Sequence, residues 1–349
     1  MPTGGTSLAV VWPPAGLLLG ALAVSDRRAW KGLLAAAGVA ALLSAAVHGR
    51  QVTAVPLVLV GLGEATAAAW FVRRTVDGPV ALNRVSHAGT LILFAVVAPV
   101  FGGALAAAIM ASAGGTPFLV AWRTWGFADA LGMLATAPIA IAIFAERTRI
   151  RERLASWNTV EFVIVFAATV AVTLSIFGEA LDPVIRVPAY TLPFLLWPAF
   201  RFGPGATSVT ILTVSVIAIW HAARGLGPLA LPDAAVTNLV LRSQGAMAVA
   251  ATSLLLLASV VAERKRVAQE NTVLVAELQR ALLEVKTLRG FIPICAWCHK
   301  VRDDAGFWQQ IEMYLDARTD ATFSHSICPS CATDAGDEIT AELMPPPPQ

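Results

Sequence analysis

The sequence predicts an all-α polytopic membrane protein with a small polar region at its C-terminal end. Of 349 residues, 57% are hydrophobic and only 14% are charged, whereas soluble domains carry about 25% charged residues. Residues 1–262 hold 26 of the 48 Asp, Glu, Lys and Arg residues, and the 87 residues that follow hold the other 22. This composition excludes a disordered chain, a disulfide-stapled secreted module and an ordinary soluble enzyme. The net charge of +2 does not suggest a nucleic-acid partner.

Long apolar runs define the large N-terminal part. A bilayer core of about 30 Å needs about 20 mainly apolar residues per helix. Nine runs are candidate spans: 7–24, 30–47, 53–71, 88–112, 124–145, 159–179, 187–200, 205–222 and 238–262. The seventh is the weakest, because it is short and contains three prolines. We therefore expect a bundle of about nine spans over residues 1–262.

Loop charges predict the orientation of this bundle. Arg- and Lys-rich loops at 25–31, 73–84 and 146–157 alternate with poorer ones, and a cluster at 264–266 follows the last run. Cationic loops stay on the cytoplasmic side, so we expect the N-terminus outside and the C-terminus in the cytoplasm. If the seventh run did not cross the membrane, the C-terminus would lie outside the cell. The distribution of loop charges argues against that. No charged segment precedes the first run, so we expect no cleaved signal peptide.

Ionisable residues inside the runs point to a candidate site, because a charge at the bilayer centre costs about 2.5–3.5 kcal/mol. The expected topology places several charged and indole side chains in the outer half of the bundle, as a candidate ligand-sensing pocket: Trp12, Trp122, Arg123, Trp125, Asp129 and Arg242. The alternative is a set of interfacial tryptophan anchors with one structural ion pair. Glu64, near the middle of the third run, is either a proton or cation site or a buried hydrogen bond between helices.

Three segments resemble a known family. Trp12-Pro-Pro-Ala-Gly16 opens the first run, Trp122-Arg-Thr-Trp-Gly126 and Asp129-Ala-Leu-Gly132 open the fifth, and Trp197-Pro-Ala-Phe-Arg-Phe-Gly203 joins the seventh and eighth. In order and spacing they resemble the bacterial membrane-associated sensor domain, type one (MASE), over about residues 7–262. This family is an input module of histidine kinases and cyclic-di-GMP enzymes. It usually carries a further helix before the Trp-Pro segment. The resemblance implies signal input at the bacterial inner (plasma) membrane and names no ligand.

Residues 263–289 predict a short coiled-coil helix. Val267, Leu274, Ala281 and Leu288 recur every seven residues, and Asn271, Leu278 and Val285 complete the a/d seam. A polar Asn271 at an a position sets register and favours a dimer. We expect a parallel dimeric signalling helix. The alternative is one amphipathic helix packed on the C-terminal domain.

Four cysteines mark a small domain over residues 290–334. Cys295-Ala-Trp-Cys298 and Cys328-Pro-Ser-Cys331 are separated by 29 residues. Two such turns supply the four thiolates of a tetrahedral Zn²⁺ site, and zinc binding would stabilise a domain too small for a large core. Between the turns we expect a short helix with Trp308, Ile311 and Leu315 on one face, and a strand over 323–327. Residues 335–349, rich in proline, predict a disordered tail.

Other uses of these cysteines stay open. Cys295-x-x-Cys298-His299 matches the pattern for covalent c-type haem, but haem leaves the second pair unexplained and is attached outside the cytoplasm. A thioredoxin-like pair lacks its βαβ context, disulfides need an oxidising compartment, and redox sensing by a zinc–thiolate site is a further alternative. Residues 288–331 also resemble a recurrent C-terminal cassette of bacterial signalling proteins, which usually has Lys where His299 stands.

The expected fold is thus an all-α polytopic membrane protein, a short coiled-coil helix and a small zinc-knuckle domain. No cyclase, kinase or P-loop motif is visible, so we expect no catalytic output and a sensory homodimer that acts through a cytoplasmic signalling protein, such as a kinase, cyclase or regulator. The alternative is a small-molecule or ion transporter that uses Glu64 and the proline-broken run at 187–200. A membrane redox protein is a third possibility.

Overall fold

The computed structural model describes residues 11–47, 54–113, 116–145, 157–178, 182, 186–229, 235–285, 292–318, 322–324 and 326–333. Two compact units, residues 1–270 and 271–349, are described separately below. The expected tail at 335–349 and the end of the connecting helix, residues 286–289, lie outside the described residues.

The first unit is a helical bundle, as predicted. In the described residues, seven helices are long and apolar enough to cross a bilayer, which confirms a polytopic, mostly helical membrane protein. They are α2 (Arg27–Val47), α3 (Ala54–Thr75), α4 (Val85–Ser112), α5 (Phe118–Ala145), α7 (Trp157–Phe177), α9 (Pro204–Ala222) and α10 (Val236–Val285). Helix α10 continues without interruption from the ninth apolar run into the expected connecting helix.

The first and seventh apolar runs form short helices in place of the two full-length spans that we expected. Helix α1 (Pro13–Val24) has 12 residues, and α8 (Leu192–Arg201) has 10 and follows a 3₁₀ turn, η2 (Pro188–Thr191). At 1.5 Å per residue these helices are about 18 and 15 Å long, roughly half of a bilayer core. Prolines account for the irregular start of the second: Pro188 opens η2, and Pro193 lies in the first turn of α8.

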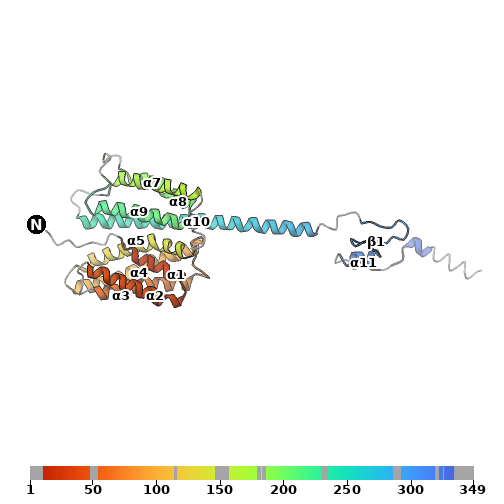
Figure 1. The fold of residues 1–349 in the computed structure, drawn as a ribbon, viewed down its shortest axis with the longest axis horizontal. Coiled ribbons are helices and arrows are strands. Elements are labelled where there is room, and N and C mark those ends of the chain that lie inside the picture. Colours follow the sequence, from red (N-terminus) through yellow and green to blue (C-terminus); the bar gives the residue numbers. More distant parts are fainter. Residues whose placement is uncertain are drawn as a thin grey trace, which may run out of the picture. The chain divides into compact units, whose positions relative to one another are not determined.

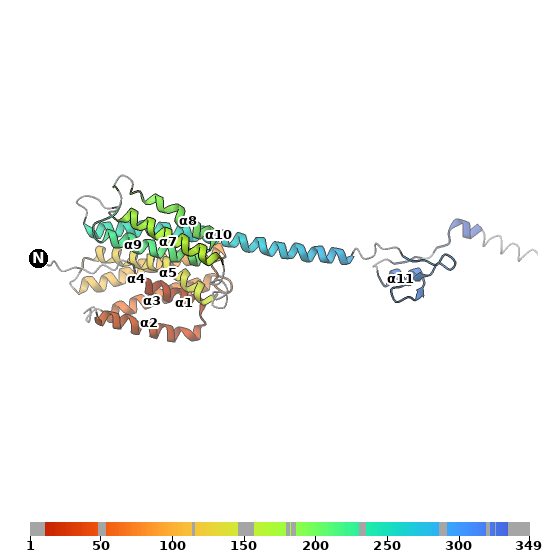
Figure 2. The ribbon, with the colours of Figure 1, turned by 45° about the horizontal axis from the view of Figure 1, so that its top comes forward.

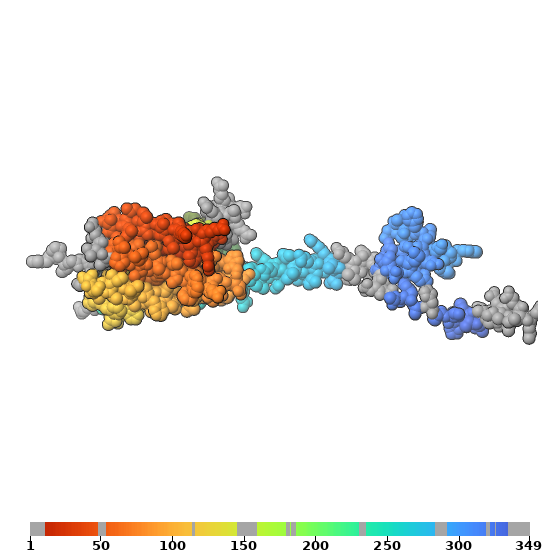
Figure 3. Space-filling model, turned by 90° about the horizontal axis from the view of Figure 1, so that it is seen from below, coloured from red at the N-terminus to blue at the C-terminus, as the bar shows by residue number. Residues whose placement is uncertain are grey.

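Helix α5 is the central element of the bundle. It packs against α1, α4 and α9. In its most apolar stretch, 72% of the residues are buried. Figures 1 and 2 show α7, α8, α9 and α10 on one side of it and α1 to α4 on the other. By contrast, α2 has no buried residue and lies at the edge of the bundle. Figure 3 shows the N-terminal helices, in red and orange, on one face of the bundle.

Helices α1 and α5 pack with their backbones in close approach. A Cβ atom built on Gly16 would lie 2.5 Å from the carbonyl oxygen of Gly132, and one on Gly20 would lie 2.5 Å from that of Ala137. Thr136 donates a hydrogen bond of 3.0 Å from Oγ1 to the carbonyl of Pro13. Small residues four apart permit such contacts in membranes, where the hydrophobic effect does not drive helices together. The Gly16-x-x-x-Gly20 spacing therefore fixes α1 on α5.

The second unit contains a small hairpin and a short helix. Strand β1 (Val301–Arg302) pairs antiparallel with β2 (Trp308–Gln309), and α11 (Ile311–Asp316) follows. The turn between the strands is closed by Asp303, whose Oδ1 accepts from the amide of Phe307 at 2.8 Å. Gly306 lies there at φ +90°, a conformation that glycine adopts without strain.

Two local expectations for this unit were wrong. Trp308 belongs to strand β2 and not to the helix, which begins at Ile311, because the turn at 303–307 pairs residues 308–309 with the preceding strand. The strand expected over 323–327 is absent from the described residues 322–324 and 326–328. An alternating apolar pattern five residues long does not form a strand without a neighbouring strand to pair with.

The close packing of α1 and α5 can be tested with Gly16→Leu. The added side chain meets the backbone at Gly132 and Met133, so we expect destabilisation by at least about 1–3 kcal/mol, the usual cost of overpacking. Thermal unfolding of the purified protein in detergent, followed by circular dichroism, measures it. Gly32→Leu is the matched control, because a Cβ atom at Gly32 meets nothing within 4 Å. Equal midpoints for the two variants would contradict the packing.

Candidate functional site

Three helices bring two carboxyl groups together inside the bundle. Glu64 lies on α3, and Asp129 lies on α5 one turn after Trp125. Residues four apart lie on the same face of a helix, so Trp125 and Asp129 both face α3. Glu64 is 5% exposed and Asp129 is 3% exposed. The structure thus buries two acidic side chains of different helices at one site.

Trp125 and Gly102 position the carboxyl group of Glu64. The indole Nε1 of Trp125 donates a hydrogen bond to Glu64 Oε2 at 3.4 Å. On the other side, a Cβ atom at Gly102 of α4 would overlap Oε2 and would lie 2.9 Å from the carboxyl carbon. Glycine at position 102 therefore makes the space that the Glu64 carboxyl group occupies between α3 and α4.

The two carboxyl groups are neighbours inside the bundle. The Glu64 charge acts on Asp129, and the indole of Trp125 lies beside both residues. Among the described residues, Glu64 Oε1 and Asp129 Oδ2 have no hydrogen-bond partner. An acceptor without a donor is costly in an apolar interior. The pair therefore suits a bound proton or small cation.

The other predicted pocket residues lie around this pair in different ways. Trp122 donates from Nε1 to the carbonyl of Val100 at 2.9 Å, which fixes α5 on α4. The amide of Trp12 donates to the carbonyl of Ala128 at 3.3 Å, and the Trp12 side chain is 38% exposed. The Trp122 indole therefore holds α4 on α5, and the Trp12 backbone amide holds the start of α1 on α5 next to Asp129.

The two arginines of the predicted pocket do not join the acidic pair. Arg123 and Arg242 are both exposed, and the ion pairs found in the described parts of the chain do not include Asp129. We expected Asp129 in a pocket with arginine partners, whereas the structure places it beside Glu64. Sequence reasoning missed this partnership because it assigned Glu64 and Asp129 to different depths. The one available signal was that both are acids within apolar runs.

The first cysteine pair lies in a tight turn. The amide of Cys295 donates to the carbonyl of Lys300 at 2.9 Å, and the amide of His299 donates to that of Cys295 at 3.0 Å. His299 has φ 56°, a left-handed conformation that closes the turn. Backbone amides of Cys298 and Trp297 lower the pKa of the Cys295 thiol, because they stabilise the thiolate.

The second cysteine pair lies at the start of a helical turn. The Ser330 hydroxyl lies 3.1 Å from Cys328 Sγ, and together with the amide of Cys331 it lowers the pKa of Cys328 to about 7. The carbonyl of Cys328 accepts from the amide of Ala332 at 2.9 Å. One cysteine of each turn, Cys295 or Cys328, thus has a lowered thiol pKa, and the thiolate is the form that binds metal ions.

The two cysteine pairs do not form one metal site in the described residues. In the described part of the chain, no group of three or more His, Cys, Asp and Glu side chains is placed to hold a metal ion. All four thiols are free, and Cys298, Cys328 and Cys331 are exposed. The joint zinc site of these cysteines therefore stays a prediction.

The predicted seam of the connecting helix is exposed. Asn271 lies on α10, and all side chains over 269–282 are exposed. Leu274 and Leu278 are 55% and 63% exposed. Apolar side chains at seam positions outside the apolar run are costly in water. Among the described residues, no element covers this apolar face of α10.

The bundle and its buried acidic pair define the chain as a polytopic helical membrane protein with a polar centre inside the membrane. The comparison with protein families then identifies it: the chain belongs to the MASE1 family of membrane-associated sensor domains, whose model matches residues 3–265. This match confirms the resemblance expected for the bundle. No curated protein and no solved structure matches the chain.

The role of Glu64 in this site can be tested by comparing Glu64→Ala with Glu64→Gln. Alanine leaves Trp125 and Asp129 without their partner and opens a cavity, so we expect a loss of about 2–4 kcal/mol of stability. Glutamine keeps an acceptor for the indole and offers a donor to Asp129, so its cost should stay below about 1 kcal/mol. Denaturation in detergent measures both.

Glu161→Ala is a control for this comparison. Glu161 also lies in a spanning helix and accepts from a tryptophan, Trp197, at 3.2 Å, but its ion pair with Arg201 is partly exposed. Such pairs contribute about 0–1 kcal/mol. If Glu64→Ala were no more costly than Glu161→Ala, the buried pair would have no structural role.

Proposed function

We propose that this chain is a sensory membrane protein of the bacterial inner membrane that relays a signal through a dimeric helix to a zinc-binding interaction module. The match to the MASE1 family over residues 3–265 carries this proposal. The module has no catalytic output of its own in this proposal. It acts through a cytoplasmic partner, such as a kinase, cyclase or regulator.

The stimulus acts at the Glu64–Asp129 pair and the indoles around it. This centre joins α3, α4 and α5, and α5 also packs on α1 and α9. A ligand that binds one arrangement of these helices more tightly than another shifts the populations of the two. The buried acceptors of the pair support this role, because a proton or cation would satisfy them in the arrangement that brings the two carboxyl groups together.

Helix α10 carries the shift out of the bundle. The carboxylate of Glu263 accepts from the amide of Val85, at the start of α4, at 2.8 Å, and Lys265 donates to the carbonyl of Phe200 at 2.8 Å. Movement of α4 or α8 therefore acts on α10. The seam around Asn271 then pairs with a second copy of the chain.

The four cysteines bind one Zn²⁺ ion when the two turns come together. The lowered pKa values of Cys295 and Cys328 support this proposal, because thiolates are the ligands that zinc prefers. The metal would join the hairpin and α11 to the second turn. The joined module would present a docking surface to the partner.

The cationic ends of α2 and α3 support the orientation proposed here. Arg27, Arg28, Lys31, Arg73 and Arg74 gather at one end of the bundle, which the positive-inside rule places in the cytoplasm. The N-terminus then lies outside and the C-terminus inside. Nine crossings require that residues next to α1 and α8 complete the passage, since these helices are only 12 and 10 residues long.

One observation favours the alternative of a transporter. The Glu64–Asp129 pair is a buried site for a proton or cation, and such sites near the membrane centre belong to many transporters. The broken element η2–α8 is exposed along one side and packs on α7 and α9. If the protein transported a solute into proteoliposomes and this uptake required Glu64, the transporter function would replace the sensory one.

The dimeric relay can be tested with Leu278→Asp in the full-length protein. A carboxylate buried in the seam has no partner, so we expect the dimer dissociation constant to rise by at least about tenfold. Light scattering in detergent measures the oligomeric state. Gln279→Asp, one residue further on and outside the seam, is the matched control. A monomeric wild-type protein, or equal effects of both variants, would contradict the relay.

The zinc module can be tested by metal analysis of the purified full-length chain. We expect about one zinc ion per chain, since four thiolates complete a tetrahedron, and less than half of that in Cys328→Ser. Ser330→Ala should retain the metal, because it removes the hydroxyl beside Cys328 but leaves all four thiols. Absorption of bound haem in the visible range, or wild-type protein without zinc, would overturn the module.

A further inference from the structure

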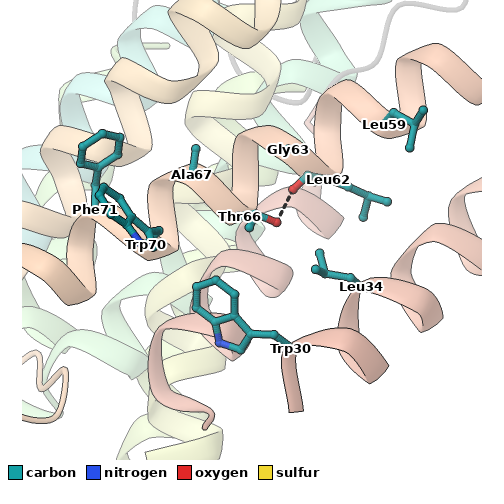
Figure 4. Close-up of a pocket in the computed structure, with 9 residues that line it drawn as sticks. All are labelled: Trp30, Leu34, Leu59, Leu62, Gly63, Thr66, Ala67, Trp70 and Phe71. Atoms are coloured by element: carbon teal, nitrogen blue, oxygen red, sulfur yellow. Dashed lines mark hydrogen bonds between the residues drawn. The ribbon is translucent and has the colours of Figure 1, made fainter. Parts of the chain in front are cut away.

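An apolar groove lies between α2 and α3 on the surface of the bundle. Its volume is about 550 Å³, and Figure 4 shows the side chains that line it, which come from both helices. Trp30 and Leu34 form the α2 wall, and Leu59, Leu62, Trp70 and Phe71 belong to the α3 wall. The hydroxyl of Thr66 in the lining donates a hydrogen bond of 2.6 Å to the carbonyl of Leu62 in its own helix.

A second hollow of about 320 Å³ continues the groove along the same two helices. It shares Leu34, Leu59 and Leu62 with the first hollow and extends to Leu42 and Val55. From Trp30 to Leu42 the groove follows twelve residues of α2, which corresponds to about 18 Å. Its length therefore matches one leaflet of a bilayer, about 15 Å.

Cationic side chains stand at one end of this groove. Arg27 lies one turn before Trp30 on the same face of α2, and Lys31 follows Trp30 and lies one turn after Arg27. Arg74 lies one turn beyond Trp70 on α3. All three are exposed. Because α2 begins and α3 ends at this end of the bundle, the three cations gather where the apolar groove meets the membrane surface.

Trp30 closes this end of the groove and is held rigidly. Its Nε1 donates to the carbonyl of Leu22 at 3.1 Å. Arg73 donates to the carbonyls of Leu22, at 3.4 Å, and Ser25, and its guanidinium lies 5.9 Å from the Trp30 ring. The arginine thus caps the C-terminal end of α1 and fixes the indole between the apolar groove and the cations.

The packing of α2 leaves the groove open. No residue of α2 is buried, and a Cβ atom at Gly63, on the α3 wall, meets nothing within 4 Å. A dry apolar groove without an occupant forfeits the dispersion contacts of its walls. In a bilayer, lipid acyl chains are available to fill such a groove. The cations at one end favour a lipid with an anionic headgroup.

We propose that the groove between α2 and α3 binds one anionic phospholipid of the leaflet that faces Arg27, Lys31 and Arg74. The acyl chain lies along Trp30, Leu34 and Leu59, and the phosphate interacts with the three cations. Basic clusters at the ends of membrane helices bind anionic headgroups in this way. The lipid links α2 to α3, which otherwise share few close contacts, and this role is independent of the sensory function.

The experiment uses the full-length protein in detergent, titrated with phosphatidylglycerol or with phosphatidylcholine that has the same acyl chains. Native mass spectrometry counts bound lipids, and thermal unfolding reports the stabilisation. We expect tighter binding of phosphatidylglycerol, by about fivefold for each cation engaged. Replacing Arg27, Lys31 and Arg74 by Gln should abolish the preference between the two lipids.

Gly63→Leu tests the groove itself. The new side chain has room and fills the groove, so we expect a folded protein that has lost at least about tenfold in affinity for phosphatidylglycerol. Gly61→Leu is the matched control, because its Cβ atom also meets nothing within 4 Å and points to the opposite side of α3. Arg84→Gln, an exposed cation at the same end of the bundle, controls for charge.

Three results would overturn the proposal. Equal binding of both lipids by the wild-type protein would remove the headgroup site. An equal stabilisation by soluble glycerol phosphate would show that the apolar groove takes no part. A change in oligomeric state caused by Gly63→Leu, without a change in lipid binding, would assign the groove to a second copy of the chain. If the triple variant fails to fold, the three single substitutions supply the same comparison.

Discussion

The close approach of α1 and α5 is the contact on which the rest of the bundle depends. Gly16 and Gly20 let a 12-residue helix, too short to cross a bilayer, lie directly on the backbone at Gly132 and Ala137. In lipid the hydrophobic effect does not drive helices together, so close packing and hydrogen bonds must do it. With α1 fixed, α5 becomes the shared neighbour of α4 and α9 and carries Trp125 and Asp129 to the centre.

The buried acidic pair follows from this arrangement. Trp125 reaches Glu64 only because α4 between them offers Gly102, where any side chain would displace the carboxyl group. The indole of Trp122 holds α4 and α5 together at the carbonyl of Val100. A polar centre in lipid is costly and is retained at functional sites. Here it joins the three helices whose relative positions a stimulus would have to change.

Much of the bundle was predictable because span length and apolar runs are local properties. The run at 88–112 and helix α4 (Val85–Ser112) agree within three residues. The lengths of the short helices α1 and α8 were not predictable, because their prolines indicate an irregular helix but not where the helix begins. Glu64 and Asp129 were each recognised as intramembrane acids, but their contact depends on the packing of α3, α4 and α5, which a single sequence does not encode locally. Each cysteine pair lies in a turn, as its spacing suggests. A contact between the two turns depends on residues far apart in the sequence, so local spacing does not predict it.

The peripheral place of α2 has a consequence for how the protein comes apart. A helix without a buried residue loses little when it separates, whereas α1 and α5 share an interface of backbone against backbone. Local opening starts where few apolar contacts are lost. Stepwise dissociation should therefore begin with α2 and leave the acidic centre intact, so harsh delipidation during purification yields a partly opened protein whose core is still native.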